Sequence, residues 1–228
     1  MTSNKKNARV AGLLYLIVII FGVFAEFFVR SKVFVPNDAA ATANNILNSE
    51  WLFRIGFVSD LIMLTAYFFL ALALYLLLKP VNKNYASLMV LCVLVAVSIL
   101  CVNMLNHIAP LLLLNGTSAF ESDQLHGMVM FFLDMHKHGY LIAQIFFGLW
   151  LFPLGYLVFK SGFFPRILGI LLMIGSFSYL TDFFIFFLFP DYVSTVSTII
   201  TLPADIAEFS LCMWLLIKGV MDQPADYQ

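Results

Sequence analysis

Two of the four histidines, His136 and His138, lie in the segment FFLDMHKHGY (131–140), which opens a long apolar run. Asp134 precedes His138 by four residues. Side chains four residues apart share one face of a helix, so this carboxylate and this imidazole can hold one metal ion between them. We expect His136 and the adjacent Lys137 to be solvated.

A second polar face lies earlier in the chain. Asn103, Asn106 and His107 follow the i, i+3, i+4 spacing of a single helix face. Imidazole and carboxylate suit a divalent metal such as zinc or iron, so His107, Asp134 and His138 form a candidate metal-ligand set. No HExxH motif supports that set. His107 and His138 are also candidate haem ligands, and the asparagine face fits hydrogen bonding between helices equally well.

The other candidate binding residues are charged side chains inside apolar segments. A charge at the bilayer centre costs about 2.5–3.5 kcal/mol on insertion scales, and such residues usually face a bundle interior or a cavity. The full set of binding candidates is Glu26, Arg54, Asp60, Asn103, Asn106, His107, Asp182, Asp205 and Glu208. Arg54 is a candidate cation for an internal network with Asp182, Asp205 and Glu208, and extension of its side chain toward the membrane surface is the alternative. For Glu26, a plain ion pair with Arg30 is an equal alternative.

The elements that position these residues are long apolar segments. Hydrophobic residues make up 62% of the 228 residues and charged residues 11%, against about 25% charged in a soluble domain. A helix that spans a bilayer needs about 20 mostly apolar residues. Six segments meet this requirement, namely 9–29, 55–78, 86–114, 139–160, 167–189 and 197–218. The sequence therefore predicts an all-α integral membrane bundle of six transmembrane helices.

The same composition restricts the partners. The net charge is −1, and no zinc-finger or RNA-binding pattern is present, so nucleic-acid binding is set aside. The lipid bilayer is the expected partner, and a small molecule or an ion is the expected ligand.

Basic residues indicate the orientation, because cytoplasmic loops carry an excess of Lys and Arg. With the N-terminus inside, eight of the twelve basic residues are cytoplasmic: Lys5, Lys6, Arg9, Lys79, Lys83, Lys160, Arg166 and Lys218. Arg30, Lys32, Arg54 and Lys137 remain on the other side. We therefore predict a multi-pass protein of the plasma membrane with both termini cytoplasmic (N-in, C-in).

Two connections outside the spans carry local structure. The Ala-rich stretch 38–54 contains Trp51, an aromatic anchor, and predicts a short extracytoplasmic interfacial helix. A helix that starts at Ser122 or Asp123 is expected to run into the fourth span. The prediction for the whole chain is one six-span domain over 1–220 and a disordered cytoplasmic tail over 221–228.

Several blocks occur in the order of a known family. They are AEFFVRSK, VPNDAAATANNI, SEWLFRIGFVSDL, LLLKPVNK, FFPRILG and LWLLIKGV. Together they resemble the prokaryotic polytopic membrane proteins grouped as domain of unknown function 4386, over about 9–220. The resemblance implies a multi-helix membrane protein of bacteria or archaea, and it supplies no activity, substrate or catalytic residue.

These observations predict an outward-facing pocket of acidic and histidine side chains within the membrane. Transport or binding of a small cation, a proton or an amphiphile is the favoured function, since it requires only buried ionisable groups. Two alternatives stay open. One is a metal-dependent intramembrane enzyme acting on a lipid-like substrate, and the other is a haem- or quinone-binding electron carrier.

Overall fold

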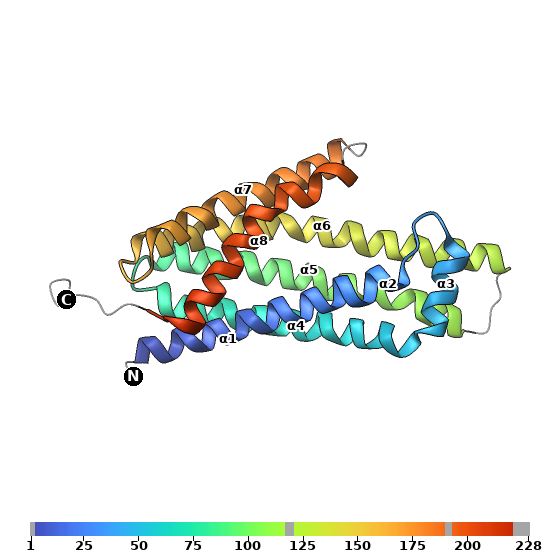
Figure 1. Ribbon diagram of the computed structural model, residues 1–228, viewed down its shortest axis with the longest axis horizontal. Coiled ribbons are helices and arrows are strands. Elements are labelled where there is room, and N and C mark those ends of the chain that lie inside the picture. Colours follow the sequence, from blue (N-terminus) through green and yellow to red (C-terminus); the bar gives the residue numbers. More distant parts are fainter. Residues whose placement is uncertain (1–2, 117–120, 190–192, 221–228) are drawn as a thin grey trace. The chain divides into compact units, whose positions relative to one another are not determined.

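The structure is a computed structural model, and it describes residues 3–116, 121–189 and 193–220. It is all-helical, with 90% of the residues in helices and no strand in the described ranges. The elements, in chain order, are α1 (Ser3–Val23), the π-helix η1 (Phe24–Arg30), α2 (Ser31–Val33), α3 (Ala39–Asn48), α4 (Glu50–Leu78), α5 (Lys83–Asn115), α6 (Ser122–Lys160), α7 (Arg166–Leu188) and α8 (Val193–Ile217) (Figure 1).

Six helical segments within the described residues are long and apolar enough to cross a membrane, which confirms the predicted fold class. The first of them, Lys5–Val33, joins α1, η1 and α2 without a break. The second, third and fourth extend beyond the predicted spans, and α6 begins at Ser122, the first of the two predicted starting positions. Hydropathy locates the apolar part of a helix, whereas the helix itself continues until its capping residue or a turn.

The short helix α3 forms within the predicted stretch 38–54, but it ends at Asn48, and the predicted anchor Trp51 belongs to α4. The Asp38 side chain accepts a hydrogen bond from the Ala41 N–H and caps the helix. The Thr42 hydroxyl donates to the main-chain oxygens of Val35 and Asp38, and the Asn45 amide donates to that of Val33. These bonds fix α3 to the chain that precedes it, with Thr42 and Ile46 buried. The membrane side on which α3 lies remains a prediction.

The described chain divides into two compact units. Unit 1 comprises Met1–Leu16, Ala66–Val97 and Ile142–Gln228, and unit 2 comprises Ile17–Thr65 and Ser98–Leu141. Helices α1, α4, α5 and α6 contribute residues to both units. The predicted single domain over 1–220 stays a prediction, and the predicted tail 221–228 lies outside the described residues.

Close helix contacts at small residues hold unit 1 together. A Cβ added to Gly169 on α7 would lie 2.6 Å from the main-chain oxygen of Gly155 on α6. Glycine therefore lets these two backbones meet, as is common for helices in lipid. Helices α7 and α8 lie side by side (orange and red in Figure 1), and Gly175 lies against Ala204 where they meet.

Candidate functional site

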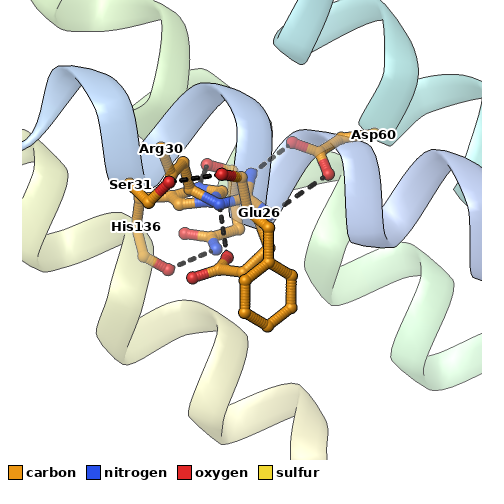
Figure 2. Close-up of polar contacts among 7 residues, drawn as sticks. Glu26, Arg30, Ser31, Asp60 and His136 are labelled. Atoms are coloured by element: carbon orange, nitrogen blue, oxygen red, sulfur yellow. Dashed lines mark hydrogen bonds and ion pairs between the residues drawn. The ribbon is translucent and has the colours of Figure 1, made fainter.

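Arg30 is the centre of the charged groups in unit 2. Its Nε donates to Glu26 Oε2 at 2.7 Å, and its Nη1 donates to Asp60 Oδ2 at 2.6 Å. Its Nη2 lies 3.5 Å from the other Asp60 oxygen. Figure 2 shows the guanidinium between the two carboxylates, with His136 beside it. We call Glu26, Arg30, Asp60 and His136 the ion-pair cluster. One guanidinium faces two carboxylates, so the charges leave one negative charge in excess.

The three charged members differ in burial. The side chain of Asp60 is 5% exposed and that of Arg30 is 22% exposed, whereas that of Glu26 is 60% exposed. Both Glu26 and Arg30 belong to the π-helix η1. Single π-turns within α-helices are uncommon and often occur at functional sites. The segment Phe24–Arg30 contains no Gly or Pro, so its sequence gives no signal of this turn.

His136 is buried, and the expectation that it is solvated is wrong. It is 8% exposed, and its Nδ1 lies 3.3 Å from the main-chain oxygen of Asn103. In return, the Asn103 amide donates to the main-chain oxygen of His136 at 2.7 Å. This approach of α5 to α6 depends on Gly139, because a Cβ there would collide with the Asn103 side chain. The Asn106 amide donates to the Asn103 side-chain oxygen at 3.0 Å.

His107 is 1% exposed and contacts the rings of Phe53, Phe57 and His136. It stacks on Phe53 with ring centroids 4.6 Å apart, and its edge meets His136 with centroids 5.0 Å apart. Neither ring nitrogen has a hydrogen bond of ordinary geometry with the described residues, although the main chain of Phe53 interacts with the ring. Buried polar atoms almost always have a partner. The two ring nitrogens of His107 are therefore able to form a further hydrogen bond.

A small cavity lies against the ion-pair cluster. Its volume is about 10 Å³, and its lining residues are Arg30, Asp60, Met63, Leu64, Leu100, Met104, His136 and Tyr140. This volume is about what one water molecule requires, and it is far below the roughly 300–1,000 Å³ of pockets that hold small organic ligands. The cavity therefore suits a water-sized species.

An apolar cluster lies next to the buried histidines in unit 2. It consists of Val33, Ile46, Phe53, Leu111 and Val129. Ile46 belongs to α3, and Phe53 is shared between this cluster and the stack on His107. The side of His107 that carries Phe53 is therefore closed by apolar side chains in this conformation.

Two acidic residues that the structure describes in unit 1, Asp182 and Glu208, are bonded to neutral side chains. Glu208 on α8 accepts hydrogen bonds from the hydroxyls of Tyr15 at 2.8 Å and Tyr179 at 2.9 Å. Asp182 on α7 is 3% exposed and accepts one from the amide of Gln144 at 2.7 Å. The same amide donates to the main-chain oxygen of Tyr179 at 3.2 Å. Asp205 is exposed, three residues before Glu208.

The predicted binding residues fall in both units. Unit 2 contains Glu26, Arg54, Asp60, Asn103, Asn106 and His107, and unit 1 contains Asp182, Asp205 and Glu208. Their convergence in one pocket stays a prediction. Arg54 is bonded to Glu50 at 2.7 Å, within its own helix and half exposed. Arg30, by contrast, pairs with a carboxylate of another span, Asp60. The sequence signal for Arg30 was its spacing from Glu26, which could not reveal Asp60 as its second partner.

The metal and haem hypotheses stay predictions. Within the described residues, no three His, Cys, Asp or Glu side chains are close enough together to hold a metal ion. Of the predicted set, His138 directs its Nδ1 to the main-chain oxygen of Asp134 at 2.7 Å. The imidazole in contact with His107 is that of His136. Metal analysis and an absorption spectrum of the purified protein test both hypotheses on one sample.

The six apolar helices and the charged groups held among them define a polytopic helical membrane protein. Residues 10–219 match the family described as "Domain of unknown function (DUF4386)", and the chain belongs to this family. It is also similar to an uncharacterized protein of Archaeoglobus fulgidus, with 34% identity over 149 residues, which cover 65% of this chain and 74% of the relative. No solved structure matches the chain.

Proposed function

We propose that this membrane protein transports a proton or a small monovalent cation, which binds at the ion-pair cluster of unit 2. The observation that carries the proposal is the arrangement of one guanidinium between two carboxylates in membrane-spanning helices. A bound positive charge would neutralise the excess negative charge, which is costly to hold in a medium of low dielectric constant.

The groups around the cluster fit a proton as the bound species. The ionisable side chains that face the cavity are Arg30, Asp60, His136 and Tyr140, and Glu26 contacts Arg30 from the exposed side. His136 lines the same cavity as Asp60 and meets the buried ring of His107. Histidine is a common proton carrier near neutral pH. The volume of about 10 Å³ favours a proton or a bare ion over an amphiphile at this cluster.

Proteoliposomes that contain a pH-sensitive dye test the proposal. With a potassium diffusion potential as the driving force, we expect the wild-type protein to acidify the lumen several times faster than empty vesicles. Asp60→Asn should reduce the rate to that of empty vesicles. The matched control is Asp182→Asn, which changes a buried carboxyl bonded to Gln144 in unit 1, and it should keep the rate.

Sodium and potassium uptake, measured in the same vesicles with radioactive tracers, separates the two cation classes. Uptake of either ion that depends on Asp60 assigns the cluster to a small metal cation. Wild-type rates equal to those of empty vesicles for all three ions would refute the proposal. Equal rates for the wild type and Asp60→Asn would also refute it.

We also propose that the protein lies in the plasma membrane with both termini in the cytoplasm. Eight of the twelve basic residues lie near the two termini or near the connections from α4 to α5 and from α6 to α7, and this bias supports the orientation. A reporter fused after Lys218 should be active in the cytoplasm, and a reporter inserted after Asn115 should be active only when exported. A cytoplasmic signal from the second reporter contradicts the orientation.

A further inference from the structure

Glu208 in unit 1 lacks a positively charged partner within the described chain. Its two oxygens accept hydrogen bonds from the phenols of Tyr15 and Tyr179. No Lys, Arg or His of the residues that the structure describes forms an ion pair with it. Charged groups in membrane-spanning helices usually pair with another group, and the described residues supply no cation for Glu208.

Aromatic rings connect the two phenols that bind Glu208. From Tyr15, successive ring centroids are 6.3 Å apart to Trp150, 5.3 Å to Tyr67, 6.0 Å to Phe147 and 6.2 Å to Tyr179. We call Tyr15, Tyr67, Phe147, Trp150 and Tyr179 the aromatic cluster. The series starts and ends at a phenol bonded to the same carboxylate. Its rings come from α1, α4, α6 and α7, and the carboxylate comes from α8.

The aromatic cluster is deeply placed in unit 1. Trp150 is 1% exposed, Tyr15 is 2% exposed and Tyr67 is 5% exposed. Glu208 is intermediate in exposure, and Asp205, on the same face of α8, is exposed. Asp205 thus adds a second negative charge one helical turn from Glu208, at the surface of the unit, where it attracts cations to this face.

The chemistry of this arrangement distinguishes among cations. A proton would neutralise Glu208 without any need for aromatic rings. A metal cation such as Ca²⁺ needs six or more oxygen ligands, and aromatic faces supply none. An alkylated ammonium, by contrast, is attracted to the faces of Trp, Tyr and Phe, and aromatic cages with this composition recognise such ligands. It has few or no N–H groups, so both phenol hydrogen bonds to Glu208 can remain when it binds.

We propose that Glu208 and the aromatic cluster form a binding site for an organic ammonium cation. The aromatic faces hold the alkylated head group, and Glu208 supplies the opposite charge. The proposal rests on contacts within unit 1, and it does not depend on the transport function proposed for the ion-pair cluster of unit 2.

Calorimetric titration of the full-length protein in lipid nanodiscs with benzyltrimethylammonium tests the site. The control ligand is neopentylbenzene, which has the same shape with carbon in place of the charged nitrogen. We expect the cation to bind at least about tenfold more tightly than the neutral ligand, since both the cation–π attraction and the carboxylate require charge. Equal affinities for the two ligands would overturn the proposal, and this comparison requires no variant.

Variants assign the binding to these residues. Glu208→Gln should weaken binding of benzyltrimethylammonium about tenfold or more, and Trp150→Leu should weaken it several-fold. Asp182→Asn, which changes a buried carboxyl outside the aromatic cluster, should bind like the wild type. Each variant is first checked for a cooperative thermal transition. A folded Glu208→Gln or Trp150→Leu protein that binds as tightly as the wild type would overturn the proposal.

A further titration with sodium chloride separates an inorganic ion from an organic one. If sodium stabilises the protein through Glu208 and benzyltrimethylammonium does not bind, the site holds an inorganic cation and the proposal is refuted. Binding of the organic cation that competes weakly or not at all with sodium supports it.

Discussion

Asp60 in unit 2 and Glu208 in unit 1 represent two ways to hold a carboxylate in a membrane-spanning helix. Asp60 receives the guanidinium of Arg30 at 2.6 Å, so the chain itself supplies the opposite charge. Glu208 receives two neutral phenols, at 2.8 Å and 2.9 Å, and aromatic rings extend from both. Arg30 is the counter-ion of Asp60, whereas the counter-ion that we propose for Glu208 is a bound organic cation.

This difference shows what each unit depends on. Arg30 both bonds to Asp60 and compensates its charge, so unit 2 draws stability from Arg30 whether or not a ligand is bound. Phenol hydrogen bonds orient Glu208 and leave its charge uncompensated, so the same stabilisation in unit 1 requires a cation from outside. We therefore expect substitutions in the ion-pair cluster to affect folding, and substitutions at Glu208 to affect binding.

The largest expected effect is that of Arg30→Gln. The change leaves the buried Asp60 carboxylate without its cation, and removal of one partner of a buried pair typically costs about 3–5 kcal/mol. The loss should appear as a lower unfolding midpoint in thermal circular dichroism in detergent. The matched control is Arg54→Gln, whose exposed pair with Glu50 should be worth at most about 1 kcal/mol.

The double variant Arg30→Gln with Asp60→Asn extends this test. It removes both charges of the pair, so part of the lost stability should return, because a stranded buried charge is the main cost. If Arg30→Gln and Arg54→Gln have the same small effect, Arg30 does not stabilise unit 2 and the contrast with Glu208 disappears.

The next effect is that of Gly139→Ala, which tests how unit 2 positions His136. A Cβ at this position would collide with the Asn103 side chain and break its hydrogen bond to the His136 main chain. Overpacking of this kind costs about 1–3 kcal/mol. Gly127→Ala on the same helix meets nothing within 4 Å, and it should be neutral or stabilising by up to about 1 kcal/mol. Equal midpoints for the two variants would contradict the role of Gly139.

The fold was predictable because its signals are local. Twenty apolar residues specify a span wherever its neighbours lie, and Asp38 caps α3 through a main-chain N–H three residues away. The contacts of the sites are not local. Arg30 lies 30 residues from Asp60, and the π-turn that contains Arg30 leaves no mark in the sequence. Hydropathy could therefore not decide between Arg30 and Arg54.

Burial of His136 was hidden for a similar reason. Its neighbours in sequence, Lys137 and His138, are exposed, so the segment has the composition of a solvated surface. The side chain is buried because Gly139 allows Asn103, 33 residues away from His136, to approach the helix. The tyrosines that bind Glu208 likewise lie 193 and 29 residues away from it. Helical spacing predicted which side chains share a face, and it could not predict which face of another helix they meet.

The smallest expected effect is that of Glu208→Gln on the protein without ligand, and it compares the two carboxylates directly. Asp60→Asn gives up charge-assisted bonds to Arg30, which are worth about 1.5–3 kcal/mol. Glutamine at 208 can still accept from one phenol and donate to the other, and it loses no cation within the described chain, so the change should cost less than Asp60→Asn. Both unfolding midpoints are measured in one detergent, free of organic cations. If Glu208→Gln destabilises the protein as much as Asp60→Asn, then Glu208 is already paired with a cation in the folded protein, and it is not a carboxylate that awaits a ligand.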